Sequence, residues 1–129
     1  MSDLKALVIC HGYLAEQLLE VVKSIIGHTD MLVPFSNVGK SLAVLKEEVK
    51  TFIDSQHIKQ AIFFVDLKGG SCWSASCQVL QDVDGVAISG VNVPMLINFV
   101  SKKEQFSTLD EFVIALSESG KNAITWSPR

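Results

Sequence analysis

The sequence predicts an α/β fold built on a doubly wound, mainly parallel β-sheet with helices on both faces. Short apolar runs alternate along the chain with longer stretches in which apolar residues recur at helical spacing. One run, residues 60–65 (QAIFFV), is apolar on both faces, which is typical of a strand buried inside a parallel sheet. This alternation favours a sheet covered on both sides, for which we expect the strand order 2-1-3-4.

The first half of the chain contains two strand–helix pairs. We expect strands at residues 4–10 and 31–35, and helices at residues 14–26 and 41–54. The first helix carries its apolar residues on one face, and Gly27 directly after it is a typical helix stop. Pro34 has no N–H group to donate to a neighbouring strand, so the second strand is expected at an edge of the sheet.

The second half of the chain continues the alternation. After the strand at 60–65 we expect a loop at 66–71, a helix at 72–81, a strand at 86–89 and a helix at about 94–101. Pro94 suits the first position of its helix. Thr108 and Glu111 form a capping box that opens a last helix, which should end near Gly120. Residues 123–126 are expected to form a short final strand.

Length and composition indicate one domain, residues 1–129, with a packed core, because 48% of the residues are hydrophobic. The net charge is −3 without a basic stripe, which argues against nucleic acid or an anionic membrane surface as a partner. No apolar run is long enough to span a bilayer, and the first residues lack a secretory pattern. Three cysteines, an odd number, are read as reduced thiols in a cytoplasmic protein.

Polar and glycine-rich segments follow three of the expected strands. His11-Gly12 follows the first strand, Asp66 and then Gly69-Gly70-Ser71 follow the third, and residues 89–92 follow the fourth. In open α/β sheets, sites form at the carboxyl ends of the strands, near the point where the strand order reverses. These segments are therefore expected to converge on one edge of the sheet.

His11 is the main catalytic candidate. A neutral imidazole is a good nucleophile towards phosphorus when a neighbour holds its other nitrogen. If the first and third strands are adjacent, Asp66 faces His11 and could accept its Nδ1–H, which leaves Nε2 free to attack. From position alone, a histidine that only hydrogen-bonds a loop and an aspartate that only caps one fit as well.

The loop Gly69-Gly70-Ser71 is the candidate phosphoryl-binding segment. Its backbone N–H groups and the following helix N-terminus suit an anion, and Ser71 could either cap that helix or bond a phosphoryl oxygen. The spacing matches neither a Walker loop nor G-x-G-x-x-G, so nucleotide binding is disfavoured. No C-x-x-C pair is present, and we expect no metal and no cofactor.

Four segments together resemble the enzyme IIA component of the mannose-type (mannose/fructose/sorbose) phosphotransferase system. They read VICHG at 8–12, LAEQLL at 14–19, FFVDLKGGS at 63–71 and GVNVPML at 90–96, in the family's order and spacing. The resemblance extends from about Lys5 to Gly120 and implies a doubly wound α/β domain. It also implies phosphorylation of His11, with Asp66 orienting the ring and Ser71 and the glycines beside the phosphoryl group.

The same resemblance implies partners. The phosphoryl group would come from the histidine-containing phosphocarrier protein and pass to a separate IIB component for sugar uptake. The resemblance also implies a homodimer, because members of this family look like homodimers that exchange a C-terminal strand. Residues 123–126 could form that strand.

The chain departs from the family loop at three positions. Leu67 and Lys68 replace a Thr-Trp pair, and Cys72 replaces a proline. Two other functions therefore stay open. One is a regulatory module whose binding to a target depends on phosphorylation of His11. The other is a small-molecule-binding domain, in which the polar strand ends would surround a pocket.

Overall fold

A computed structural model describes residues 1 and 3–128. Its centre is a sheet of four parallel strands, which are β1 (Leu4–Cys10), β2 (Leu32–Ser36), β3 (Gln60–Val65) and β4 (Asp84–Ser89). The strand order is β2-β1-β3-β4, which confirms the predicted 2-1-3-4 order and the edge position of the strand that contains Pro34. β1 and β3 are thus the two central, adjacent strands, with Ile9 opposite Val65 near their carboxyl ends.

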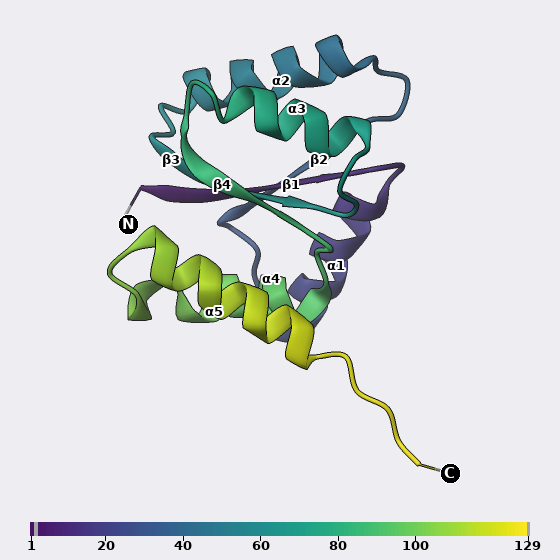
Figure 1. Ribbon diagram of the computed structural model, residues 1–129, viewed down its shortest axis with the longest axis vertical. Helices are drawn as coiled ribbons and strands as arrows, with labels where there is room; N and C mark the ends of the chain where they lie inside the picture. Colours follow the sequence, from purple (N-terminus) through teal and green to yellow (C-terminus); the bar gives the residue numbers. More distant parts are fainter. Residues whose placement is uncertain (2, 129) are drawn as a thin grey trace.

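Helices cover both faces of the sheet (Figure 1). They are α1 (Leu14–Ile26), α2 (Leu42–Ser55), α3 (Ser71–Val79), α4 (Val93–Lys102) and α5 (Leu109–Asn122), with a short 3-10 turn η1 (Lys103–Gln105). α2 and α3 lie on one face, and α1, α4 and α5 lie on the other. Among the described residues, no helix combines the length and apolar character that a membrane crossing requires.

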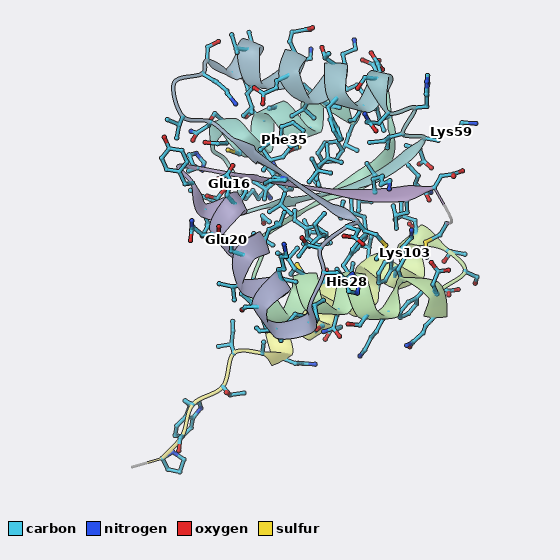
Figure 2. All side chains as sticks on the ribbon, turned by 180° about the vertical axis from the view of Figure 1, so that it is seen from behind. Glu16, Glu20, His28, Phe35, Lys59 and Lys103 are labelled. Carbon is cyan, nitrogen blue, oxygen red and sulfur yellow. The ribbon has the colours of Figure 1, made fainter. Side chains whose placement is uncertain are left out.

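The core consists of two layers, one on each face of the sheet. Side chains of the central strands alternate between the layers, so that Phe64 packs towards α4 and α5 while Phe63 packs towards α2 and α3. Phe35 of β2 joins the α2 side, where it lies between sheet and helix (Figure 2). All of β3 after Gln60 is buried, as expected from its continuous apolar run.

Side-chain caps fix the ends of several helices. The Ser41, Asn92 and Thr108 side chains accept hydrogen bonds from backbone N–H groups in the first turns of α2, α4 and α5. Gly27 ends α1 in the left-handed conformation, with φ of 92°, as predicted. These local signals explain why most helix boundaries lie within two residues of those expected.

Several boundaries differ from the prediction by one or two residues, and three elements illustrate this. α3 covers Ser71–Val79 rather than 72–81, β4 begins two residues early at Asp84, and Pro94 is the second rather than the first residue of α4. These shifts are small because the apolar pattern fixes the middle of an element better than its ends.

Within a single chain, residues 123–126 do not form the expected strand. The segment has no regular structure and extends away from the body (Figure 1). Ile124 and Trp126 are 82% and 87% exposed. A strand needs a partner edge to satisfy its backbone groups, and the tail does not pair with the sheet of its own chain.

Candidate functional site

Two predicted site residues meet at the carboxyl ends of the central strands. His11 directly follows β1 and Asp66 directly follows β3. The Nδ1 atom of His11 lies 3.2 Å and 3.1 Å from the two carboxylate oxygens of Asp66. The backbone N–H of His11 donates a further hydrogen bond of 3.0 Å to Oδ2 of Asp66. Asp66 therefore holds both the ring and the main chain of His11, rather than only capping its own loop.

This contact decides which imidazole nitrogen is available for chemistry. A carboxylate beside Nδ1 favours the tautomer that carries its proton there, and the lone pair then lies on Nε2. Nε2 takes part in none of the hydrogen bonds found among residues 1 and 3–128. The His11 side chain is 39% exposed and that of Asp66 is 16% exposed. The His11 side chain is thus partly exposed at the rim, while its partner Asp66 is more shielded.

Gly70 lies directly against the imidazole. A Cβ atom built on this residue would lie 2.7 Å from Cε1 and 2.9 Å from Nε2 of His11. The backbone of Gly70 is extended, with φ of −91°, so space rather than conformation requires the glycine. Gly70, a residue of the predicted loop, therefore lets the main chain approach Nε2 of His11.

Ser71 is not the cap of the helix. Gly70 occupies the N-cap position of α3 and Ser71 is the first helical residue, so the capping role considered for Ser71 is wrong. N–H groups in the first turn of a helix have no partner within the helix, and the dipole makes this end positive. Because Gly70 touches the ring, this positive end lies beside His11.

Ser36, the last residue of β2, and Asn37 directly after it also hold the His-Gly turn, although neither is among the site residues predicted from the sequence. Oδ1 of Asn37 accepts a 2.9 Å hydrogen bond from the N–H of Gly12. The Ser36 hydroxyl donates a 2.6 Å hydrogen bond to the carbonyl of Gly12. Gly12 itself has φ of 60°. Their position could have indicated this role, because both polar residues directly follow the strand expected at residues 31–35, at the edge of the sheet where His11 and Asp66 lie.

Two cysteines lie close to the pair. Burial, and then the negative charge of Asp66, raises the pKa of the Cys72 thiol to about 11 and that of the Cys10 thiol to about 12. Both thiols are therefore protonated at neutral pH and are poor nucleophiles. Cys72 nonetheless places its sulfur beside His11 and Asp66, since their ligand atoms lie within 4.8 Å of one another.

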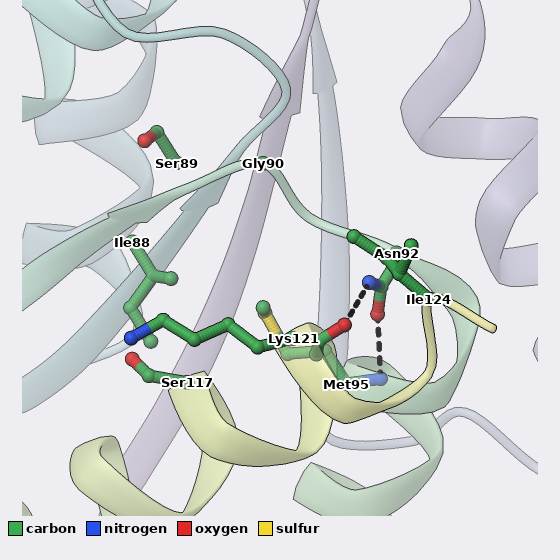
Figure 3. Close-up of a pocket in the computed structure, with 9 residues that line it drawn as sticks. Ile88, Ser89, Gly90, Asn92, Met95, Ser117, Lys121 and Ile124 are labelled. Carbon is green, nitrogen blue, oxygen red and sulfur yellow. Dashed lines mark hydrogen bonds between the residues drawn. The ribbon is translucent and has the colours of Figure 1, made fainter.

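The residues after β4 serve the fold instead of this site. The Asn92 side chain caps α4 through the N–H of Met95 and donates a 3.0 Å hydrogen bond to the carbonyl of Gly120 on α5. A cavity of about 170 Å³ lies here, between β4, α4 and α5 (Figure 3). His11 and Asp66 do not line it. This cavity is therefore not the small-molecule pocket considered above, which the polar strand ends of β1 and β3 would surround.

Comparison with known proteins gives a consistent result. Residues 5–116 match the family described as the PTS system fructose IIA component. The chain is 30% identical over 123 residues to the mannose-specific EIIAB component of the phosphotransferase system of Escherichia coli K12, which covers 88% of this chain. The chain spans 36% of the length of that relative.

Solved structures show the same fold. The phosphotransferase system component EIIA from Streptococcus agalactiae matches with a TM-score of 0.81 at 23% identity, over 95% of each chain. The mannose/sorbose-specific IIA subunit from Enterococcus faecalis matches with a TM-score of 0.83 at 19% identity, over 97% of this chain and 95% of that one.

Proposed function

The chain belongs to the family of mannose-type IIA components of the phosphotransferase system, and we propose that His11 is its phosphorylated residue. The donor is the histidine-containing phosphocarrier protein and the acceptor is a IIB component, within a cytoplasmic relay for sugar uptake. The observation that carries the proposal is the contact between Nδ1 of His11 and both oxygens of Asp66, at an open rim of the sheet.

The first transfer uses Nε2 of His11 as the nucleophile. Its lone pair forms a bond to phosphorus as the bond between phosphorus and the donor imidazole breaks, and the electron pair of that bond returns to the donor ring. The His11 ring gains positive charge in this step, which the carboxylate of Asp66 offsets at about 3 Å. The second transfer reverses these roles, with His11 as the leaving group and the IIB component as the nucleophile.

The phosphoryl oxygens are met by the start of α3. Phosphoryl transfer depends mainly on positioning and on stabilisation of charge on the equatorial oxygens. Gly70 lies next to the ring, its neighbours Gly69 and Ser71 add backbone N–H groups and a hydroxyl at the start of α3, and the helix dipole adds attraction for an anion. The donor phosphoryl group is already energetic, so this step uses no nucleotide.

The surface around His11 suits protein partners. Tyr13, Leu14 and Leu67 are 65%, 42% and 59% exposed, and they directly follow the strand ends that carry His11 and Asp66. Exposed apolar side chains around a reactive group are typical of a protein-docking surface. A phosphorylated histidine on another protein can reach Nε2 here without entering a pocket.

The test is a phosphorylation assay with phosphoenolpyruvate, enzyme I and the phosphocarrier protein. The full chain should acquire an acid-labile, base-stable phosphate, and His11→Ala should abolish it. The chain offers matched controls in its two other histidines, so His28→Ala and His57→Ala should retain the label. A label that persists on His11→Ala would contradict the proposal.

The acceptor step separates this function from its alternative. Addition of a IIB protein to the isolated phosphorylated chain should remove the phosphate within the time of the assay. A phosphate that stays in place, together with a partner that binds only one phosphorylation state, would favour a regulatory interaction module. The exposed Leu67 and Lys68, which depart from the family loop, are the observation that keeps this alternative in view.

A further inference from the structure

Three different metal-ligating groups meet at the rim of the sheet. One imidazole nitrogen of His11, one carboxylate oxygen of Asp66 and Sγ of Cys72 all lie within 4.8 Å of one another. They come from three separate places in the chain, which are the end of β1, the end of β3 and the first turn of α3. The sequence predicts no metal because it lacks ligands at the short spacings of common zinc motifs, whereas the fold assembles these three from distant positions.

The donor set suits zinc. Imidazole, thiolate and carboxylate are all zinc ligands, whereas magnesium and calcium prefer oxygen atoms alone. Ligand atoms of a tetrahedral zinc ion lie about 3.5 Å apart, so small side-chain rotations would close the present spacing. Three protein ligands leave a fourth position for water. Cys10 faces the opposite layer of the core from Cys72 and does not complete the set.

We propose that His11, Asp66 and Cys72 bind a zinc ion, and that zinc at this place prevents phosphorylation of His11. When zinc binds, it replaces the proton on Sγ of Cys72, and that proton passes to solvent. Zinc also takes the single lone pair of the neutral imidazole, at whichever nitrogen it binds. The other nitrogen then carries the proton, so the ring has no lone pair left to attack phosphorus.

The binding part of this proposal is independent of the proposed function, and only the competition rests on it. Binding is tested on the full chain with cobalt(II), which occupies zinc sites and shows charge-transfer absorption when a thiolate is a ligand. Wild type should show this absorption, and zinc should displace it. Cys72→Ser and Cys72→Ala should lose it and weaken zinc binding at least about 10-fold in a chelator competition.

Cys77→Ser is the matched control, because Cys77 is exposed on the same helix and lies outside the cluster. This variant should bind cobalt and zinc as wild type does. A second measurement needs no substitution at the site. Zinc should shift the ring NMR signals of His11 in wild type and leave those of His28 and His57 in place. No thiolate absorption in wild type, equal loss in Cys77→Ser, or a shift only at His28 or His57 would overturn the site.

Competition is measured with the phosphorylated donor protein, comparing each variant with and without zinc so that direct effects of the substitution cancel. Zinc should slow phosphorylation of wild type and Cys77→Ser at least about 10-fold more than that of Cys72→Ser. Equal inhibition of all three would place the effect of zinc on the donor and overturn the competition. Failure of wild type to accept phosphate without zinc would instead refute the proposed function and leave the binding result standing.

Discussion

At the scale of single residues, the account depends on how one carboxylate holds one histidine. Asp66 accepts from both Nδ1 and the backbone N–H of His11, so it fixes the ring and the turn together. Its side chain is largely shielded, which strengthens its attraction for a charged ring. An amide in its place could keep the contact but would carry no charge to offset that of the phosphorylated ring.

Asp66→Asn should therefore slow phosphorylation of His11 by about 100-fold or more while the chain stays folded. Rapid-quench kinetics with the phosphorylated donor measure the rate, and circular dichroism checks the fold. Asp54→Asn, at an exposed position of α2, is the control and should react at the wild-type rate. A wild-type rate in Asp66→Asn would show that the carboxylate only supports the loop.

Gly70→Ala tests the close approach of the main chain to the ring. A Cβ atom 2.7 Å from Cε1 of His11 forces the imidazole to move, and we expect phosphorylation to slow at least about 10-fold because reacting groups must be closely aligned. Gly120→Ala on α5 is a matched control, because the Cβ atom added there would lie nearest to the flexible end of the Met95 side chain. Equal rates in the two variants would mean that the ring tolerates displacement.

At the scale of elements, capping side chains fix where helices begin, and one of them also links two helices. Asn92 caps α4 and also binds the carbonyl of Gly120 on α5, whereas Thr108 only caps α5. Asn92→Ala should lower the free energy of unfolding by about 2 kcal/mol and Thr108→Ala by about 1 kcal/mol. Urea unfolding measures both values. Equal losses would show that the link between α4 and α5 adds no stability.

Elements could be predicted where local chemistry decides them. The apolar run of β3, the amphipathic face of α1 and the cap of α5 are each visible within a dozen residues of sequence. The pairing of His11 with Asp66 was expected on the condition that β1 and β3 are adjacent, as they are, because adjacent parallel strands end at the same edge. The approach of Cys72 to the ring could not be predicted, since it depends on where α3 begins and how it packs.

At the scale of the whole molecule, the sheet has an open edge and the chain has an exposed apolar tail. β4 pairs only with β3, and Ile124 and Trp126 are almost fully exposed. Open strand edges and exposed apolar side chains both favour association. We propose that two copies form a homodimer in which each tail pairs with the other copy, while residues 1–129 of each copy form one domain. Sequence patterns within one chain do not determine this, because the partner of the tail in such a dimer would lie outside that chain.

Removal of residues 124–129 should accordingly convert the protein from dimer to monomer in sedimentation velocity. Removal of residues 128–129 alone is the control and should leave the dimer intact. A full chain that sediments as a monomer, or a truncated chain that remains dimeric, would refute the exchange. Either result would leave the site at His11 unaffected, because that site lies entirely within one chain.

The most direct test of the whole account is the position of the phosphoryl group on the His11 ring. Heteronuclear NMR of the phosphorylated chain, labelled with nitrogen-15, distinguishes the two ring nitrogens by their coupling to phosphorus. Because Asp66 occupies Nδ1, we predict that phosphorus is bonded to Nε2 of His11 and that Nδ1 keeps its proton. Phosphorus bonded to Nδ1, or to His28 or His57, would contradict the account.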